Sequence, residues 1–381
     1  MRIAHLCLSC FYIDNTAYQE NELVRQHVAT GHNVLVIAST ETYSPDGRVA
    51  YVEPAEYRTS EGARMVRLPY SGPGPHKIVR KLRRHPGVMR LLTEFQPEAI
   101  LFHGTCGWEL LTAANYVKAH PHVPLYVDSH EDWNNSARTF TSRELLHRRY
   151  YGPILRRALP YVRKILCLST ESIDFVHELY RVPRDLLEFY PLGGRPVPDQ
   201  EYELRRAAAR SLYGLGPQEI AFVQSGKQTK RKKLIESLTA FAAVPNARFR
   251  LLIAGVLSED IRKEATSLIA SDPRVSFLGW KSPEELTSLL CAADIYLQPG
   301  TQSATMQNSL CARCAVILDD VPAHAVYYRE NGWLIGPNRS LLSVLSDIST
   351  KNPDLARMQA TSFEVAKSML DYAVLAERVL R

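Results

Sequence analysis

Short apolar runs alternate with helix-like stretches along this chain, and the alternation constrains the fold more than any other feature. Residues 2–9, 33–39 and 99–104 are among the runs that read as strands. They are apolar at nearly every position rather than at every second one, which is typical of parallel strands buried on both faces. The sequence therefore predicts an α/β fold with helices covering a parallel sheet.

A Pro- and Gly-rich stretch, PLGGRPVPDQ at 191–200, interrupts the alternation, which then starts again. At 381 residues the chain exceeds a comfortable single core. We expect two Rossmann-like domains, 1–195 and 196–360, with a cleft between the carboxyl ends of their sheets. The last segment, 361–381, is expected to be a helix that packs back on the first domain.

The composition is that of an ordinary soluble globular protein, with 45% hydrophobic and 23% charged residues. The formal net charge is +6, a mild excess that favours anionic ligands or surfaces. No stretch approaches the ~20 apolar residues that span a bilayer, and the start does not read as a secretion signal. We expect a cytoplasmic protein.

Seven cysteines raise the question of a metal site. Cys7 with Cys10 and Cys311 with Cys314 have the CxxC spacing of zinc ligands. The two pairs lie far apart in sequence, however, and Cys7 belongs to an apolar strand pattern. The interpretation that we prefer is reduced, mostly buried thiols, with no metal and no cofactor.

The stretch SGKQTKRKKL, residues 225–234, leaves a strand through Gly226 and enters a helix amid a group of cations: Lys227, Lys230, Arg231, Lys232 and Lys233. A helix N-terminus already favours an anion, and the added lysines predict a site for a diphosphate. A solvated basic turn is the alternative.

The stretch PGTQSATMQNSL, residues 299–310, lies between two strand-like runs yet holds no ionisable side chain. Residues 301–303 can cap the start of a helix, whose open N–H groups, with the Ser303 and Thr305 hydroxyls, would face phosphate oxygens. Gln302 and Asn308 offer neutral partners for sugar or ribose hydroxyls. An ordinary capped helix remains the alternative.

DSHEDWNNS, residues 128–136, follows the strand PLYV, so His130 is expected at the sheet edge. Asp128 or Glu131 can fix its tautomer or raise its basicity. His103 follows another strand and is a weaker candidate for the same place. Residues Tyr18, Gln19, Glu20 and Asn21 either shape an acceptor pocket or simply begin a capped helix with an acidic first turn.

Two segments, 76–92 and 143–163, mix cations with apolar or aromatic residues at helical spacing. This pattern favours contact with a membrane surface over plain solvated helices. Nucleic acid is a less favoured partner, because no nucleic-acid-binding motif is present and the net charge is modest.

Several of these motifs together resemble glycosyltransferase family 4, whose members have the GT-B fold. Gly226, Lys227, Lys232 and Lys233 match its Gly-Arg turn and Lys-Gly element. RVSFLGWKSPEELTSLLCAADIYLQPG, ENGWLIGP, GHNVLVIAST, VDSHEDW and PLGGR resemble further elements, so that the likeness covers nearly the whole chain. Thr301 and Ser309 stand where the family usually has two glutamates. The Gly-Gly pair that the family often keeps after the first strand is missing from 18–27.

The resemblance implies transfer of a sugar from a nucleotide-diphosphate sugar to a hydroxyl of a glycan or lipid-linked acceptor. It implies retention of configuration without a metal. The catalytic residues would then be His130, Lys227 and Lys232. Donor contacts would come from Gly226, Gly279, Trp280, Gln302, Ser303, Thr305, Asn308 and Ser309, and acceptor contacts from Tyr18, Gln19, Glu20, Asn21 and His103.

The loop composition also resembles that of enzymes of bacterial surface polysaccharide synthesis, including lipopolysaccharide, and the protein would act at the inner face of the cell membrane. Two other functions stay open. One is a nucleotide-sugar epimerase or hydrolase of the same fold, which would need acid and base groups around the sugar. The other is a non-catalytic glycan-binding homologue, which the missing glutamates motivate.

Overall fold

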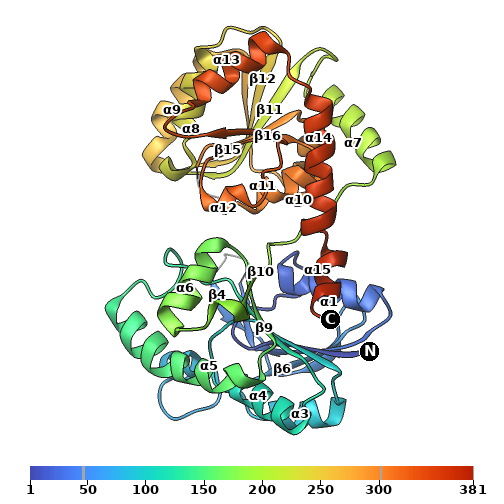
Figure 1. The fold of residues 1–381 in the computed structure, drawn as a ribbon, viewed down its shortest axis with the longest axis vertical. Coiled ribbons are helices and arrows are strands. Elements are labelled where there is room, and N and C mark those ends of the chain that lie inside the picture. The colour runs from blue at the N-terminus through green and yellow to red at the C-terminus, as the bar shows by residue number, and fades with distance from the viewer. Residues whose placement is uncertain (45–47, 301–302, 381) are drawn as a thin grey trace. The chain divides into compact units, whose positions relative to one another are not determined.

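The computed structural model describes residues 1–44, 48–300 and 303–380, and the chain divides into two compact units (Figure 1). Unit 1 comprises Met1–Pro191 and Tyr372–Arg381, and unit 2 comprises Leu192–Asp371. The division thus falls within the Pro- and Gly-rich stretch, four residues before the boundary expected from the sequence. Both units are mixed α/β folds built on parallel sheets, as the alternating pattern predicts.

Unit 1 is built on an eight-stranded sheet in the order β10-β9-β8-β7-β1-β2-β6-β5. All neighbours are parallel except β5, which runs antiparallel to β6 at the edge. The strands are β1 (Arg2–Cys7), β2 (Asn33–Ser39), β5 (Glu56–Arg58), β6 (Arg64–Leu68), β7 (Ala99–Phe102), β8 (Leu125–Ser129), β9 (Lys164–Cys167) and β10 (Leu187–Phe189), and β3 (Glu41–Tyr43) pairs with β4 (Val49–Tyr51) in a separate ribbon.

Helices cover both faces of this sheet and bury its continuous apolar strands. They are α1 (Gln19–Ala29), α2 (His76–Leu82), α3 (Val88–Phe95), α4 (Glu109–Ala119), the π-helix η1 (Thr141–Tyr151), α5 (Gly152–Ala158), the 3₁₀ turn η2 (Leu159–Tyr161), α6 (Thr170–Tyr180), the 3₁₀ turn η3 (Arg184–Leu186) and α15 (Tyr372–Arg378). Pro153, in the first turn of α5, lacks an N–H group, which fits the change from η1 to α5 there.

Unit 2 is built on a six-stranded, all-parallel sheet in the order β13-β12-β11-β14-β15-β16. The strands are β11 (Ile220–Gln228), β12 (Phe249–Leu257), β13 (Val275–Gly279), β14 (Ile295–Gln298), β15 (Ala315–Asp319) and β16 (Gly332–Ile335). The helical segments are α7 (Asp199–Leu212), η4 (Lys230–Lys232), α8 (Leu234–Ala242), α9 (Glu259–Ser271), α10 (Pro283–Ala292), α11 (Ala304–Cys311), α12 (Pro322–Ala325), α13 (Leu341–Lys351), α14 (Leu355–Val365) and η5 (Ala366–Leu370).

The end of the chain differs from the single helix expected over 361–381. Residues up to Asp371 belong to unit 2, where Gly194 N–H donates to Leu370 O at 2.7 Å. Asp371 has an extended backbone (φ −58°, ψ 122°), which ends the helical run before α15 begins. Only α15 therefore belongs to unit 1, where Leu375 packs in one cluster with Leu23 of α1.

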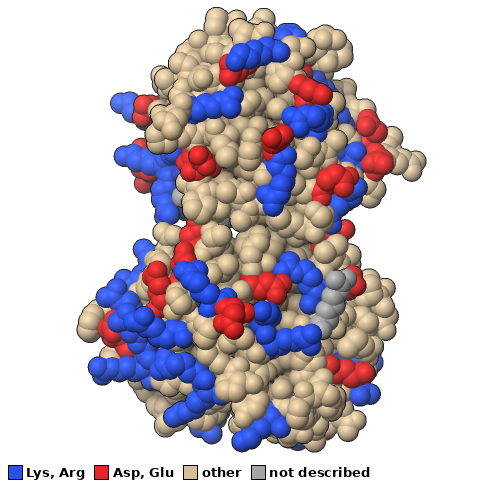
Figure 2. Space-filling model, in the orientation of Figure 1, with Lys and Arg blue, Asp and Glu red and all other residues tan. Residues whose placement is uncertain are grey.

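Charged side chains are unevenly distributed over unit 1. Figure 2 shows lysines and arginines gathered on the part of the unit that carries α5 and α6. The exposed arginines of η1 and α5 are Arg143, Arg148, Arg149, Arg156 and Arg157. In the part of the chain that the structure describes, no helix has the length and apolar character needed to cross a bilayer.

The cysteines are all free, and every one except the half-buried Cys10 is buried. The two CxxC pairs fall in different units, Cys7 and Cys10 in unit 1 and Cys311 and Cys314 in unit 2. Burial raises the pKa of the Cys311 and Cys314 thiols. These two thiols are therefore part of the core, as the apolar sequence around them indicates.

Candidate active site

Three predicted residues of unit 1 come together at the carboxyl end of β8. His130 Nε2 lies 3.7 Å from Asp128 Oδ1 and 3.9 Å from Glu20 Oε1 in the first turn of α1. Asp128 and Glu20 are buried, whereas the side chain of His130 is 36% exposed. Burial lowers the pKa of His130, but the Asp128 carboxylate outweighs it and the net shift is upward. His130 is thus a partly accessible imidazole between two carboxylates.

A chain of hydrogen bonds runs from Asp128 through three buried histidines. His103 Nδ1 lies 2.5 Å from Asp128 Oδ2, and His103 Nε2 lies 3.0 Å from His5 Nδ1. His5 Nε2 then lies 2.9 Å from His27 Nδ1, and His27 Nε2 lies 3.0 Å from the carbonyl oxygen of Ala376. The chain joins β8, β7, β1, α1 and α15 within unit 1.

Counting protons along this chain assigns its charge state. The carboxylate and the carbonyl at its two ends only accept, so the four hydrogen bonds require four N–H groups, whereas three neutral imidazoles supply three. One ring is therefore an imidazolium. Burial lowers the pKa of His27 to about 4 and that of His5 well below its usual value. Burial also disfavours the charged form of His103, yet Cys7 and Asp128 raise its pKa to about 10, so His103 holds the charge.

The predicted contact of His103 with the acceptor is wrong. Its two ring nitrogens face Asp128 and His5, and its side chain is fully buried. It has no ring nitrogen left for an acceptor hydroxyl. Gly104 N–H also donates to Asp128 Oδ1 at 2.8 Å, so that His103 and Gly104 together fix the carboxylate beside His130.

The other predicted acceptor residues, Tyr18 to Asn21, begin α1 and take different positions. Tyr18 is 48% exposed, whereas Gln19 and Glu20 are buried. Asn21 is buried too, and its amide donates to Ile13 O at 2.9 Å while its Oδ1 accepts from Thr16. The Asn21 side chain therefore fixes the loop after β1. Its predicted contact with the acceptor is wrong. The acceptor contacts of Tyr18 and Glu20 stay predictions.

In unit 2, the lysine-rich turn and the loop after β14 lie against each other. A Cβ atom added at Gly300 would lie 2.1 Å from Arg231 O and 3.0 Å from Lys232 Cα, so only glycine permits the approach. Gln224 of β11 holds the turn from beneath by donating to Lys232 O at 2.9 Å. The sequence predicts both segments as parts of one phosphate site, and within this unit they are adjacent.

The lysines of the turn differ in their surroundings. Lys232 is half-buried, and burial, with a smaller effect of Arg231, lowers its pKa to about 8. Lys233 is in an ion pair with Asp319 (Nζ to Oδ2, 2.7 Å), and Lys227 is exposed. Gly226 has a φ of 111°, which glycine adopts without strain at the end of the strand. Lys232 is therefore the cation whose charge an added anion would most stabilise.

The predicted helix of the 299–310 stretch is α11, and its polar residues divide into two groups. Ser303 caps it, accepting from Met306 N–H at 3.4 Å, and its hydroxyl donates to Gln298. Ser309 is fully buried and donates to Met306 O at 2.6 Å, which corrects its expected role as a donor contact. Thr305 is half-buried and Asn308 exposed. Thr301 and Gln302 lie outside the described residues.

The predicted base-binding segment ends β13 at the edge of the unit 2 sheet. Gly279 has a φ of 67°, and a Cβ atom there would meet nothing within 4 Å. Trp280 follows with 71% of its surface exposed, and Phe277 is 40% exposed. The indole is thus free to stack on a planar ligand, the role that the sequence assigns to it.

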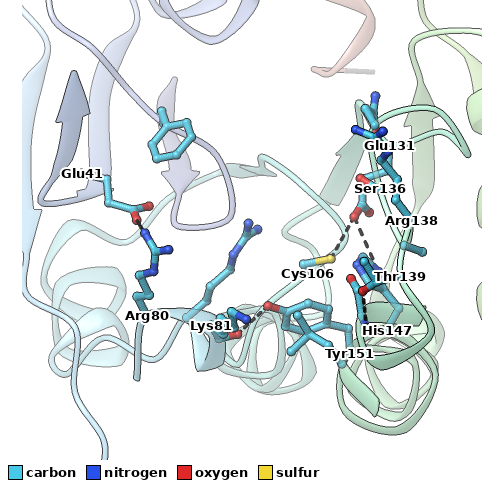
Figure 3. A pocket seen from close by; sticks show the side chains of 16 residues that line it. Glu41, Arg80, Lys81, Cys106, Glu131, Ser136, Arg138, Thr139, His147 and Tyr151 are labelled. Atoms are coloured by element: carbon cyan, nitrogen blue, oxygen red, sulfur yellow. Dashed lines mark hydrogen bonds and ion pairs between the residues drawn. The ribbon is translucent and has the colours of Figure 1, made fainter. Parts of the chain in front are cut away.

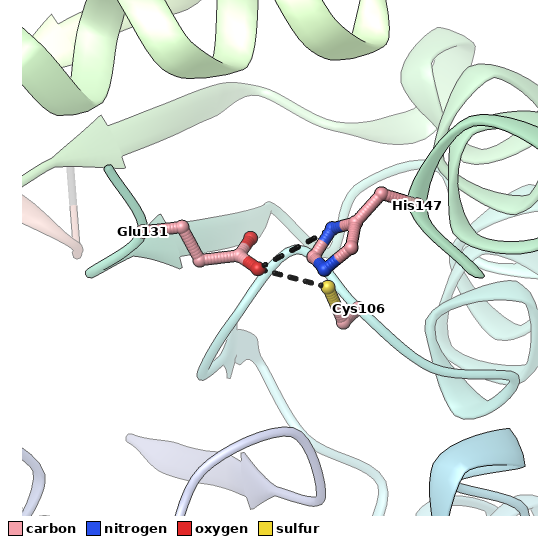
Figure 4. Close-up of side chains that lie close together, drawn as sticks. All are labelled: Cys106, Glu131 and His147. Atoms are coloured by element: carbon pink, nitrogen blue, oxygen red, sulfur yellow. Dashed lines mark hydrogen bonds and ion pairs between the residues drawn. The ribbon is translucent and has the colours of Figure 1, made fainter. Parts of the chain in front are cut away.

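Unit 1 also contains a pocket of about 390 Å³ between α2, the loop after β8 and the start of η1 (Figure 3). At its base, Cys106, Glu131 and His147 place their potential ligand atoms within 4.8 Å of one another (Figure 4). Cys106 Sγ donates to Glu131 at 3.2 Å, and Tyr180 hydroxyl lies 2.6 Å from His147 Nδ1. The donor set would suit zinc, yet hydrogen bonds within the protein already engage each group.

The family model described as Glycosyltransferase Family 4 matches residues 21–193. These residues form a glycosyltransferase family 4 domain. The match lies in unit 1 apart from its last two residues, and includes α1 from Asn21 onward, the end of β8 and every pocket residue except Phe11. No curated protein matches the sequence.

Solved structures match almost the entire chain. Sucrose-phosphate synthase from Thermosynechococcus elongatus has a TM-score of 0.63 and 15% identity, over 99% of this chain and 96% of that chain. HepE from Anabaena in complex with UDP has a TM-score of 0.64 and 13% identity, over 100% and 98%. WaaG, a glycosyltransferase involved in lipopolysaccharide biosynthesis, has a TM-score of 0.58 and 18% identity, over 99% and 98%. The chain therefore has the GT-B fold of two Rossmann-like domains.

The histidine chain and the pocket were not expected from the sequence. A faint signal for the histidine chain is His5, the one polar residue in the buried part of the strand RIAHLC, after the exposed Arg2. A buried strand position that carries histidine needs a hydrogen-bond partner. His27 and His103 lie on different elements, and only the assembled sheet brings them to His5.

Proposed function

We propose that this protein is a retaining, metal-independent glycosyltransferase. It takes a nucleotide-diphosphate sugar in unit 2 and transfers the sugar to a hydroxyl of a glycan or lipid-linked acceptor in unit 1. The pathway would be the synthesis of a bacterial surface polysaccharide or glycoconjugate, at the inner face of the cell membrane. The solved structures of HepE with UDP support the nucleotide class, and WaaG supports the pathway class.

The observation on which this proposal rests is the close approach of Gly300 to the turn at Arg231 and Lys232. It brings a loop without any acid against a cationic turn at one place in unit 2. Lys232 is half-buried, and its pKa is lowered. The electrostatic attraction between Lys232 and a bound anion would therefore be stronger than at an exposed lysine. A diphosphate has the charge and the size for such a place.

Cleavage of the donor breaks the bond between the anomeric carbon and the β-phosphate oxygen, which leaves negative charge on that oxygen. Lys232 and Lys227 stabilise the charge as it develops, as does the start of α11. The acceptor oxygen bonds to the anomeric carbon on the same face, and its proton passes to the phosphate oxygen. His130, held beside Asp128 and Glu20, orients the acceptor hydroxyl.

Product analysis with a panel of UDP-, GDP- and ADP-sugars tests the activity. With an acceptor extract present, we expect a labelled sugar to move to the acceptor, and the His130→Ala variant to slow this by roughly two orders of magnitude. Isomerised sugar nucleotide without acceptor would instead show an epimerase. Nucleotide release that no acceptor accelerates would show a hydrolase.

A non-catalytic glycan-binding protein is the second candidate function, and Ser309 is the observation that favours it. This residue stands where the family usually has a glutamate, and its hydroxyl is engaged by Met306 O. The contact with the donor that the glutamate makes in the family is therefore missing. Binding of a nucleoside diphosphate without any turnover of the sugar panel would support this candidate against the enzyme.

A membrane surface is the partner that we propose for the basic face of unit 1. Phe140 and Leu145 are 72% and 51% exposed at the start of η1, among the exposed arginines of that segment. Ile78 of α2, in the second basic segment, is 55% exposed. Apolar side chains among cations are typical of surfaces that bind anionic lipid.

Vesicle sedimentation tests this partner. We expect the chain to sediment with vesicles that contain about 30% anionic lipid and not with zwitterionic vesicles, and binding to weaken at high salt. The double variant F140S/L145S should reduce sedimentation several-fold. Equal binding to both kinds of vesicle, or none to either, would contradict the proposal.

A further inference from the structure

The pocket of unit 1 has the dimensions of a small-molecule site. Its volume of about 390 Å³ falls within the range of roughly 300–1,000 Å³ that is usual for ligand pockets. Every lining residue belongs to unit 1, so the pocket is complete within that unit. Glu131 lines the pocket and directly follows His130 in the sequence, so the loop that carries His130 also forms part of the pocket wall.

The charges that line this pocket do not balance. The lining includes four cations, Arg80, Lys81, Arg83 and Arg138, and two carboxylates, Glu41 and Glu131. Tyr70 hydroxyl donates to Glu41 at 2.6 Å, and Arg80 Nη1 lies 3.9 Å from the same carboxylate. Glu131 accepts from Thr105 and from Cys106. Both carboxylates are therefore engaged by the protein's own donors.

Two of the cations have no such engagement. Within the described residues, neither the ammonium of Lys81 nor the guanidinium of Arg138 donates to a protein acceptor or pairs with an acid. Arg83 is half-buried, and its Nη1 donates to Ser9 O. All three cations line the same pocket, and Arg83 is partly desolvated, so its pairing with an anion would be stronger than at an open surface.

The remaining lining groups are of the kind that bind sugars. Within the described residues, the hydroxyl groups of Ser136 and Ser142 have no hydrogen-bond partner in the protein, and Phe11 and Tyr151 add aromatic rings to the lining. Hydroxyl groups and aromatic rings suit the polar edge and the apolar face of a pyranose ring. The pocket thus combines a cationic wall with neutral polar and aromatic walls.

We propose that this pocket binds the acceptor, and that the acceptor is an anionic sugar, one that bears a phosphate or a carboxylate group. The ligand is an acceptor only if the proposed glycosyltransferase function holds. Binding of an anionic sugar in the pocket does not depend on that function. The anionic group lies among Lys81, Arg83 and Arg138, and the sugar ring reaches toward His130.

Calorimetry with the full chain tests the proposal, with saturating UDP present so that the lysine turn of unit 2 is occupied. Glucose 6-phosphate and glucuronate represent the two anionic sugars, and glucose the neutral one. Inorganic phosphate and glycerol 3-phosphate represent a bare anion and a lipid headgroup. We expect at least one anionic sugar to bind about tenfold or more tightly than glucose, and more tightly than either sugar-free phosphate.

A matched pair of variants locates the site. K81Q/R138Q removes the two unengaged cations, and we expect it to weaken the binding of the anionic sugar about tenfold while UDP binding stays unchanged. R143Q/R148Q removes two cations that pair with Glu144 and do not line the pocket, and it should change neither affinity.

Four results would overturn the proposal: no anionic sugar binds, glucose binds equally well, K81Q/R138Q binds as the unchanged protein does, or the sugar-free phosphates bind as tightly as the sugar phosphates. These results are separate from a failure of the proposed function. Absence of binding by UDP, GDP and ADP alike would count against the donor site, and the pocket variants would still decide the sugar site.

Discussion

The carboxyl ends of the two sheets differ in their charge. The edge in unit 1 has a buried pair of opposite charges, and the edge in unit 2 has a group of lysines. In unit 1, the charge of Asp128 is buried and balanced by the His103 imidazolium, which hydrogen bonds fix on both sides. In unit 2, the corresponding edge gathers Lys227, Lys230 and Lys232 near a loop without acids, and of these Lys232 has its pKa lowered to about 8 by burial and by Arg231.

In unit 1 the protein's own groups balance the charge, whereas in unit 2 the proposed diphosphate would balance part of it. The polar cluster of unit 1 is neutral overall and hydrogen-bonded from β8 to α15, so its geometry does not depend on a bound molecule. In the cationic turn of unit 2, Lys233 pairs with Asp319, and a bound anion beside Lys232 would lower the electrostatic energy further. Mutations at the two edges should therefore affect different properties, folding stability in unit 1 and ligand affinity in unit 2.

The largest effect is expected for Asp128→Asn, which leaves the buried His103 charge without its carboxylate. We predict a loss of about 3–5 kcal/mol in the stability of unit 1, measured by hydrogen exchange of its amides. Nucleoside diphosphate binding in unit 2 should change less than about twofold.

Asp174→Asn is the matched control for this change. Asp174 pairs with Arg184 at 2.8 Å, but its side chain is 51% exposed. The loss in the stability of unit 1 should therefore stay below about 1 kcal/mol. Equal losses for the two variants would contradict the buried charge pair.

Lys232→Ala should reduce turnover by roughly two orders of magnitude, because the developing phosphate charge loses its half-buried cation. Steady-state kinetics with the identified donor would measure the effect in kcat. Ser309→Ala should change kcat less than about threefold, since the Ser309 hydroxyl donates to Met306 O. The reverse order of effects would refute the phosphate assignment.

Gly300→Ala should weaken nucleoside diphosphate binding about tenfold. The added Cβ would overlap Arg231 O, so the loop must move away from the turn. Gly216→Ala is the control in the same unit, because its Cβ would meet only side-chain atoms of Glu219 at 3.7 Å or more. Calorimetric affinities that are equal for the two variants would show that the close approach is irrelevant to binding.

The affinity for a nucleoside diphosphate should fall about tenfold from about pH 7 to about pH 9. Lys232 has a pKa of about 8, so its charged fraction falls as the pH rises through that value, while the diphosphate is already ionised. Lys232→Arg should abolish most of this dependence, because arginine stays charged. An affinity that does not change with pH in the unchanged protein would contradict the lowered pKa.

The sequence reveals the parts of the site that are local. The turn at Lys227 to Lys233 and the strand end at His130 are predicted because each is a short motif next to one strand. The α/β pattern is predicted because buried strands impose apolar runs. The edge strand β5 and its neighbour β6 are short and have no such run, since Glu56, Arg58 and Arg67 lie within them, and the sequence does not indicate them.

Contacts between distant segments are what the sequence does not reveal. Gly300 meets Arg231 only because β14 pairs with β11, and His5 meets His27 and His103 only after β1 and β7 are neighbours. The predicted donor contact of Ser309 is wrong for a related reason. Its spacing fits a ligand contact, but α11 turns its hydroxyl toward its own backbone.

The most direct test is calorimetry of UDP, GDP and ADP, each against its own nucleoside, with the unchanged chain and with Lys232→Ala. The account predicts that at least one diphosphate binds about 100-fold or more tightly than its nucleoside, and that the variant removes most of this difference. A nucleoside that binds as tightly as its diphosphate, or no binding by any diphosphate, would contradict it.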